Sequence, residues 1–291
     1  MTQTSPPLQP APGPRLGGRT AAYNRDEIVS QLEAFYDFLP HIPVEAVHKP
    51  PPGGWPSLTA SSLGANIGGK SPEVVELLRR IPYIDGVHKD SVAGSSYHDT
   101  HPWIANEAYP CDYRVVSQVG LGELSECDVP GWVLNVRDDV GFAVRPSYGD
   151  AGGGVAPWVV QLTTGTDREG YCWMLDTTDG TVTRYCAMKS EYEPTYPQGD
   201  ARAWRDRMCD DVTRTLGDLL AEWSRDYRDM AVLGLPNLDS GGGYPGLYFR
   251  GDGPGSYRWN ETERIYKEHG WPDNYDKTAC HRVLETWWRR S

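Results

Sequence analysis

The stretch GYCWMLDTTDGTVTRYC, residues 170–186, decides how we expect this chain to fold. Two apolar runs flank a polar centre. Its Asp179-Gly180 pair is among the strongest short-range signals for a β-hairpin, because glycine tolerates a positive φ. Aspartates in turns commonly accept hydrogen bonds from nearby backbone N–H groups, and we assign that role to Asp176 and Asp179. The stretch therefore predicts two antiparallel strands and a tight turn, whose carboxylates shape the turn and take no part in a reaction.

Each apolar run also carries a cysteine, Cys172 or Cys186, and the length of the turn decides whether the two thiols can meet. A two-residue loop, Asp179-Gly180, places them on opposite faces, whereas a three-residue loop, 178–180, places them directly opposite each other. A direct cross-strand disulfide is geometrically awkward and easily reduced. The chain's six cysteines form no C-x-x-C motif and no zinc-ligand spacing. We expect reduced, mostly buried thiols, and the sequence leaves open whether these two pair.

Further strands are predicted on both sides of the hairpin. GWVLNV (131–136) and GFAV (141–144) flank a short polar turn, and APWVVQL (156–162) precedes the hairpin after another polar segment. Adjacent apolar runs joined by short polar turns are typical of an antiparallel meander. GLYFR, residues 246–250, is a candidate for a late edge strand.

Helices are predicted before and after these strands. Asn24 and Thr215 are each followed three residues later by an acid, as in a capping box, and then by apolar residues at helical intervals. Ser71 followed by Pro72 is typical of a helix start. Two helices are expected near the C-terminus, one capped by Asn260 and one starting at Asp276. The last of these is expected to bury Val283, Leu284, Trp287 and Trp288.

The order of these elements predicts an α+β fold, a mostly antiparallel sheet with helices packed against it and helical N- and C-terminal segments. Residues 1–22 are rich in proline and glycine and are expected to form a disordered tail. We expect residues 23–110 to form a helical and loop segment. Residues 111–291 are expected to form the α+β core with the C-terminal helices, in one continuous domain with 23–110.

The composition bounds the classes of partner. The formal net charge is -12 and the pI about 5.0, which argues against nucleic acid and anionic membranes as partners. No window of apolar residues is long enough to span a membrane, and the N-terminus has no apolar signal region. We therefore expect a soluble, cytoplasmic protein whose partner is another protein.

The segment YHDTHPW, residues 97–103, is the best candidate for metal or acid-base chemistry. His98 and His101 are three residues apart with Asp99 between them, but Pro102 favours a loop, and a third protein ligand is not evident. We therefore predict no metal site and no cofactor, and keep these three residues as catalytic candidates in an alternative interpretation. Gly68-Gly69-Lys70-Ser71 leads into a helix, but it lacks the spacing and the preceding strand of a phosphate-binding loop.

The aromatic residues are the best candidates for recognition. The chain has 11 Trp and 17 Tyr but only 4 Phe, and several tryptophans lie in or beside expected loops. Indole and phenol rings suit binding surfaces because they combine an apolar body with a polar atom. The candidate binding residues are Trp55, Trp103, Trp132, Trp158 and Trp173. Acids between 210 and 229 are interpreted as a solvated helix face.

Three segments together resemble the SMI1/KNR4 (SUKH) superfamily: DVPGWVLNV, GYCWMLDTTDGTVTRYC and TLGDLLAEWSRDYRDMAVL. The matching positions are Asp176, Asp179-Gly180, Val182, Leu216, Leu219, Leu220 and Trp223. The chain as a whole is also similar to a lineage of filamentous-fungal proteins, a likeness that implies no activity. The superfamily resemblance implies an α+β fold and a non-catalytic interaction module. Members include bacterial immunity proteins that bind toxins and fungal regulators of cell-wall synthesis and signalling.

Two functions follow as hypotheses. The first is an intracellular, non-enzymatic protein-binding module of SUKH type. The second is a small-molecule enzyme, a cyclase or hydrolase of a fungal pathway, with an aromatic-lined pocket and His98, Asp99 and His101 at its mouth. A cavity of several hundred Å³ holding two or more of those side chains would favour the enzyme. A shallow aromatic groove on the sheet would favour the binding module.

Overall fold

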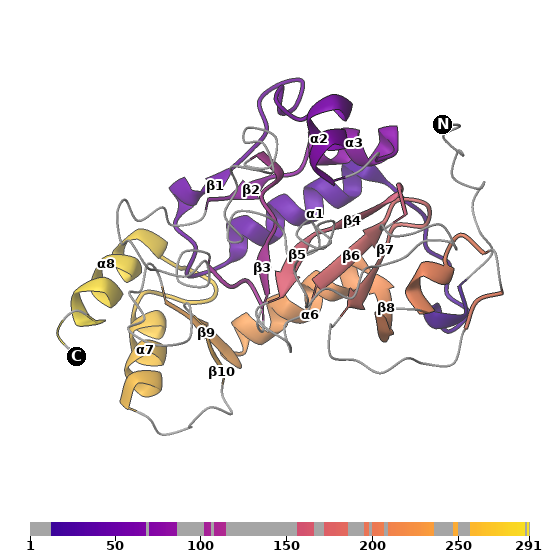
Figure 1. Cartoon of the computed structure of the whole chain (residues 1–291). Helices are drawn as coiled ribbons and strands as arrows, with labels where there is room; N and C mark the ends of the chain where they lie inside the picture. The colour runs from indigo at the N-terminus through magenta and orange to yellow at the C-terminus, as the bar shows by residue number, and fades with distance from the viewer. Residues whose placement is uncertain are drawn as a thin grey trace, which may run out of the picture.

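A computed structural model describes residues 13–67, 70–85, 102–105, 108–114, 156–165, 172–185, 195–197, 200–206, 209–235, 247–249, 257–288 and 290. Helical segments precede and follow antiparallel strands, which confirms the predicted α+β class (Figure 1). The strands expected at 131–136 and 141–144 lie outside the described residues.

A four-stranded antiparallel sheet forms the centre of the fold (Figure 1). Its strands are β4 (Val159–Gln161), β6 (Cys172–Asp176), β7 (Thr181–Tyr185) and β8 (Cys209–Thr215), in the spatial order β4-β6-β7-β8. Each neighbouring pair is antiparallel. The meander predicted from residues 156–175 and the hairpin is therefore confirmed.

The turn of the β6–β7 hairpin is longer than either loop that the sequence suggested. Asp176 pairs with Thr181, so four residues, 177–180, form the connection. The physical reason is that two aspartates each fold the chain: Asp176 Oδ1 accepts the Thr178 N–H at 2.8 Å, and Asp179 Oδ1 accepts the Thr181 N–H at 3.0 Å. In this register Tyr185, and not Cys186, lies opposite Cys172.

The two faces of the sheet pack against different partners. Alternate residues such as Trp173, Leu175 and Val182 belong to the main hydrophobic core. On the opposite face, Val159 and Met174 form a smaller cluster that also contains Ala156, Trp158 and Trp204. The alternation of side chains along these strands therefore places residues in two separate hydrophobic cores.

Helices α6 (Leu216–Arg228) and α1 (Arg25–Phe38) cover the main-core side, and they contact each other (Figure 1). The predicted N-caps of these two helices are confirmed. Thr215 Oγ1 accepts the Asp218 N–H at 3.1 Å, and the Asn24 side chain accepts the Glu27 N–H at 3.2 Å. The apolar residues of each helix are buried, and their packing holds α6 against the sheet.

The chain between α1 and β4, together with the segment directly after β4, forms short elements. These are the 3-10 helix η2 (Val44–Ala46), α2 (Ala60–Ile67), α3 (Pro72–Leu78), and the strand pairs β1 (Val47–His48) with β2 (Tyr83–Ile84) and β3 (Ala108–Pro110) with β5 (Thr163–Gly165). Ser71 caps α3 with Pro72 at its first turn, as predicted.

Side chains from this region close the outer edge of β4. Lys70 Nζ donates to the Val159 carbonyl at 2.9 Å, and the Tyr113 hydroxyl donates to the Gln161 carbonyl at 2.8 Å. The neighbouring Trp158 carbonyl accepts from Thr177 on the hairpin side at 2.9 Å. Because carbonyls alternate in direction along a strand, Val159 and Gln161 point away from the hairpin, and both are satisfied by side chains.

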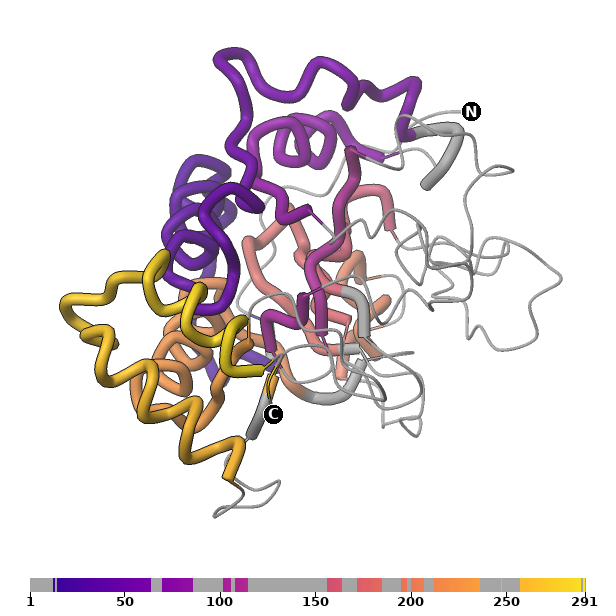
Figure 2. The backbone as a smooth tube through the Cα atoms, turned by 90° about the vertical axis from the view of Figure 1, so that its left-hand side faces the viewer, coloured from indigo at the N-terminus to yellow at the C-terminus, as the bar shows by residue number. Residues whose placement is uncertain are grey.

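The C-terminal part consists of β9 (Val232–Gly234) paired with β10 (Leu247–Phe249), followed by α7 (Tyr257–Glu268) and α8 (Lys277–Trp288). Figure 2 shows α8 beside the end of α1, where His281 and Tyr275 bond the Pro40 carbonyl. The late strand at 246–250 is confirmed.

Two expectations for these helices are wrong in detail. Helix α7 begins at Tyr257, so Asn260 lies inside its first turn and is not the cap. Val283 on α8 is exposed, because the buried face of that helix is formed by Cys280, His281 and Leu284. Trp287 and Trp288 are only partly buried.

The N-terminal segment joins the fold earlier than the sequence suggests. A 3-10 helix, η1 (Pro14–Leu16), lies against β8, and Leu16 is buried. Arg15 Nη2 donates to Asp206 Oδ1 at 3.0 Å, and Asp206 belongs to another 3-10 helix, η4 (Ala203–Asp206). The expected disordered tail therefore does not extend to residue 22, because Arg15 and Leu16 are held by distant partners.

Within the described ranges, every helix is too short or too polar to span a lipid bilayer.

Candidate functional site

The structure describes some of the candidate residues named from the sequence. His98, Asp99, His101 and Trp132 lie outside the described residues. The four remaining tryptophans are described, and one of them, Trp173, lines the pocket described below.

The other three tryptophans serve packing. Trp55 donates its indole N–H to the Ile81 carbonyl at 3.0 Å. Trp103 and Trp158 are buried in the main and the smaller core respectively. We therefore assign these three residues to the framework of the protein.

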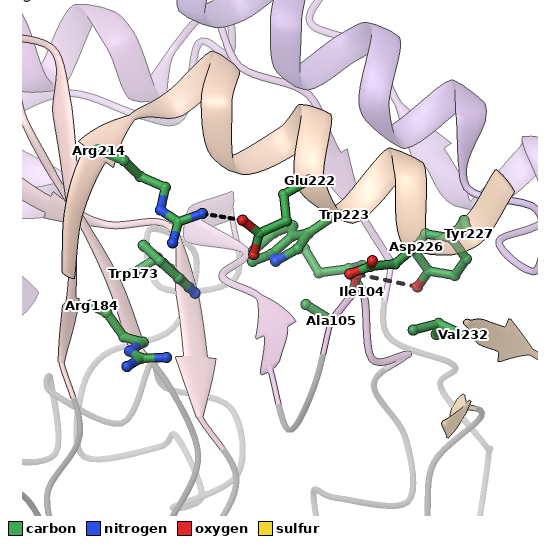
Figure 3. A pocket seen from close by; sticks show the side chains of 10 residues that line it. All are labelled: Ile104, Ala105, Trp173, Arg184, Arg214, Glu222, Trp223, Asp226, Tyr227 and Val232. Atoms are coloured by element: carbon green, nitrogen blue, oxygen red, sulfur yellow. Dashed lines mark hydrogen bonds and ion pairs between the residues drawn. The ribbon is translucent and has the colours of Figure 1, made fainter. Parts of the chain in front are cut away.

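A pocket of about 190 Å³ lies between the sheet and α6 (Figure 3). The sheet supplies one wall, α6 supplies the other, and the segment before β3 together with β9 supplies the rest. Its lining residues are Ile104, Ala105, Trp173, Arg184, Arg214, Glu222, Trp223, Asp226, Tyr227 and Val232.

The sheet wall combines an indole with two guanidinium groups. Trp173 on β6 pairs directly with Arg184 on β7, so both side chains project from the same face. Arg214 on β8 pairs with Val182, two residues from Arg184 on the same face. The guanidinium carbon of Arg214 lies 5.7 Å from the centroid of the Trp173 ring, a cation–π contact.

The helix wall places two carboxylates on either side of an indole. Glu222 and Asp226 are one turn apart on α6, so they share a face beside Trp223. Glu222 Oε2 accepts from Arg214 Nη1 at 2.5 Å, which joins the two walls across the pocket (Figure 3). The Trp223 ring lies 6.0 Å from Trp173 in an edge-to-face arrangement.

The base of the pocket is fixed by a hydrogen bond. The Tyr227 hydroxyl donates to the Ile104 carbonyl at 3.1 Å and ties α6 to the segment that precedes β3 (Figure 3). Because Tyr227 is buried, this bond is shielded from water. Packing and this hydrogen bond therefore both fix the base of the pocket, where the two walls meet.

The electrostatic environment of Asp226 differs from that of a solvated helix face. Burial raises the pKa of its carboxyl above the ordinary value. The neighbouring charges of Glu222 and Asp229 raise it further, and the charge of Arg225 opposes this rise. Sequence reasoning assigned this acid to solvent, because helical spacing cannot show that a sheet faces it. The strand register, which brings Arg184 and Arg214 to that face, was the missing information.

A second polar cluster, the Arg205 cluster, lies on the opposite face of the sheet. Its members are Arg205, Asp176, Asp179, Thr181 and Thr183. Arg205 is fully buried, and its guanidinium donates to Asp176 Oδ2 at 3.0 Å and to Thr183 Oγ1 at 3.0 Å. Burial raises the pKa of Asp176, while the positive charge of Arg205 lowers it.

The Arg205 cluster explains why the hairpin turn is so polar. The predicted turn role of Asp176 and Asp179 is confirmed, and both also form ion pairs with Arg205. Sequence reasoning missed this arginine, which lies 29 residues from Asp176. The β6–β7 turn carries two acids, and the strands on either side of it bury residues on both faces of the sheet. That combination was a signal for a buried cation. The hydrogen bonds and ion pairs of Arg205 join it to the other members of this largely buried cluster, so we assign it a structural role.

The glycine-rich segment before α3 does not present its lysine to a ligand. Lys70 is buried and donates to the Val159 carbonyl of β4 at 2.9 Å. Burial lowers its pKa to about 7. The Lys70 side chain therefore serves the edge of the sheet.

Chemically, the pocket is equipped for binding. The described residues that line it include no serine, cysteine, histidine or lysine, so they form no Ser–His or Cys–His pair of nucleophile and base. Among the residues that the structure describes, no group of three or more His, Cys, Asp or Glu side chains could hold a metal ion.

Comparisons with protein-family models, curated proteins and solved structures give no match to this chain. The resemblance to the SUKH superfamily therefore stays a prediction.

Proposed function

We propose that this chain is a non-enzymatic protein-binding module of SUKH type, and that it acts in the cytoplasm. The observation that carries the proposal is the pocket between the sheet and α6, whose walls combine Trp173, Trp223 and four charged side chains. Aromatic and arginine side chains around a central hollow are characteristic of the residues that dominate protein interfaces.

The size of the pocket supports a protein partner. Small-molecule sites usually enclose roughly 300–1,000 Å³, whereas this pocket encloses about 190 Å³. A space of that size suits one or two side chains that a partner inserts. The surrounding elements would then contribute the flatter part of the interface.

Site-specific crosslinking tests the proposal. A photoreactive amino acid replaces Ser224, which neighbours the pocket residues on α6, and a matched chain carries it at Tyr257, which is exposed on α7. We expect crosslinks to one protein from position 224 and none from position 257. Equal products from both positions would contradict the proposal.

Quantitative binding then uses the purified partner. Trp223→Ala removes a half-buried indole from the pocket, and Trp288→Ala removes a half-buried indole from α8. We expect Trp223→Ala to weaken binding about tenfold or more, the loss typical of an interface anchor, and Trp288→Ala to leave the dissociation constant unchanged. Thermal denaturation of both variants checks that each remains folded.

A small-molecule enzyme is the second candidate, and the raised pKa of Asp226 favours it. A carboxyl that keeps its proton at higher pH can serve as a general acid. Native mass spectrometry separates the candidates: a small molecule bound at one per chain, whose conversion requires Asp226, supports the enzyme and contradicts the binding module.

A further inference from the structure

The four charged side chains of the pocket are not equally paired. Arg214 and Glu222 form an ion pair across the walls at 2.5 Å. Among the described residues, no donor lies within hydrogen-bonding distance of the Asp226 carboxylate. Figure 3 shows Arg184 and Arg214 at one end of the pocket and Asp226 and Tyr227 at the other, with Trp223 between the ends.

The surroundings of Asp226 favour a positive charge beside it. Burial raises the pKa of Asp226, and the charge of Glu222, one turn before it, raises it further. The charge of Arg225 lowers the pKa, but Arg225 forms no hydrogen bond with the carboxylate. A cation placed there would offset both effects, because it neutralises the carboxylate and screens it from Glu222.

The rings beside Asp226 narrow the kind of cation. Trp223 lies next to it on α6, and Trp173 contacts Trp223 from the sheet at 6.0 Å. A guanidinium group can stack on an indole face and form two parallel hydrogen bonds with a carboxylate at the same time. An ammonium group forms a less directional contact with both partners.

The charge of the whole chain points the same way. The net charge of -12 attracts basic segments of a partner over long distances. Of the two carboxylates that line the pocket, Glu222 is already paired with Arg214, so Asp226 is the one with which an incoming basic side chain can pair.

We propose that the pocket receives an arginine side chain of the partner, with its guanidinium paired to the Asp226 carboxylate and stacked on Trp223. This inference rests on the proposed function, because it names the residue that a protein partner inserts.

The test uses Nα-acetyl-arginine amide as the probe and the matching citrulline amide, which has nearly the same shape without the charge. Each is titrated into the full chain, and NMR of isotope-labelled tryptophan side chains reports binding. We expect saturable shifts with the arginine probe, centred on the Trp223 indole. Binding of the citrulline probe should be about tenfold weaker, the difference expected for a charge-assisted pair.

Two variants assign the effect to the pocket. Asp226→Asn removes the carboxylate charge and keeps the shape, and Asp229→Asn removes an exposed acid from the end of the same helix. We expect Asp226→Asn to weaken arginine binding about fivefold or more, and Asp229→Asn, which removes only a neighbouring charge, to weaken it much less. Equal binding of the two probes, or equal effects of the two variants, would overturn the inference.

The outcomes separate this inference from the proposed function. If a protein crosslinks from position 224 but its affinity is unchanged by Asp226→Asn, the inference fails and the proposed function stands. If the arginine probe binds in an Asp226-dependent manner but no protein crosslinks, the proposed function fails and the pocket is a guanidinium site for a small molecule.

Discussion

Gly180 meets two requirements at a single position of the hairpin turn. Its φ is 74°, a left-handed conformation that is costly for other residues. A Cβ built on it would lie 2.7 Å from the Ala22 carbonyl oxygen, so the turn also packs against the chain that leads into α1. The glycine therefore serves both the turn and its contact with the N-terminal segment.

Replacement of Gly180 by alanine separates these two requirements when it is compared with Gly53. Gly53 also has a positive φ, 92°, but a Cβ there meets nothing within 4 Å. We expect Gly53→Ala to cost about 1 kcal/mol of unfolding free energy for its conformation alone. Gly180→Ala should cost more, by at least about 1 kcal/mol, because of the clash. Urea unfolding measures both, and equal losses would show that the contact with Ala22 is unimportant.

Asp176 shows how one residue can be assigned correctly and still incompletely. The turn hydrogen bond from Thr178 was predictable, because it depends on residues two apart. The ion pair with Arg205 depends on a segment beyond β7, which no local pattern reveals. The sequence therefore predicts the hydrogen bond to Asp176 Oδ1 and does not reveal the ion pair at Asp176 Oδ2.

At the scale of elements, the junction of α1, α6 and β9 depends on a neutral histidine. His41 is buried, and its Nε2–H donates to the Trp103 carbonyl at 2.8 Å. Its ring stacks on Tyr227 at 5.7 Å, and Nδ1 has no hydrogen-bond partner among the described residues. A proton on Nδ1 would therefore create a buried charge without compensation.

This junction is expected to make the protein sensitive to acid. Burial lowers the pKa of His41 to about 3, and it also lowers that of His281. In the unfolded chain, histidine takes up its proton near its ordinary pKa of 6.5. As pH falls from 6.5 towards 3, the unfolded state therefore binds more protons, and the free energy of unfolding decreases.

The His41→Gln variant checks this assignment, because it keeps a donor for Trp103 and removes the titrating ring. Unfolding free energies are measured by urea denaturation between pH 6.5 and 5, where the unfolded-state protonation of His41 is complete within about one pH unit. We expect the wild-type slope to exceed that of the variant by up to about 1.4 kcal/mol per pH unit. Identical slopes would show that His41 does not carry the acid sensitivity.

The elements themselves were largely predictable, because their signals are local. Asn24, Ser71 and Thr215 each cap the helix that follows them, and the β6–β7 hairpin follows from alternation and Asp-Gly. The exact turn length was not predictable. It depends on two aspartates folding the chain together, and each alone would permit a shorter loop.

The candidate site was predictable only in part. Trp173 was named from its residue type. Glu222 and Asp226 lie on the polar side of α6 and were both interpreted as solvated; Glu222 is exposed, whereas Asp226 is half-buried. The part of α6 that faces the pocket can be identified only once the positions of Arg184 and Arg214 are known. Strand pairing across the sheet fixes those positions. Such long-range register is absent from helical periodicity.

At the scale of the whole molecule, two buried arginines join segments that are distant in the sequence. Arg15 reaches Asp206 across 191 positions, and both side chains are nearly inaccessible, at 3% and 6%. Arg205, beside Asp206 in η4, holds the β6–β7 hairpin. The N-terminal segment, η4 and the hairpin are therefore fastened as one unit.

The contribution of the N-terminal segment can be measured with two arginines of different exposure. Arg15→Ala leaves Asp206 without its buried partner and is expected to cost about 3 kcal/mol of unfolding free energy. Arg19→Ala removes an ion pair with Asp218 whose side chains are 65% and 49% exposed, and it should cost less than about 1 kcal/mol. Thermal and urea unfolding provide the comparison. Similar losses would mean that the Arg15 pair does not anchor the segment.

The side chains along β4 have a further consequence for how copies of this protein meet. An uncovered strand edge invites backbone pairing with a neighbouring chain, the first step in fibril growth and domain exchange. The ammonium group of Lys70 and the phenol of Tyr113 already occupy the Val159 and Gln161 oxygens that such an intruder would need. This flank of the molecule is thereby shielded against self-association, and recognition by strand addition is blocked along it.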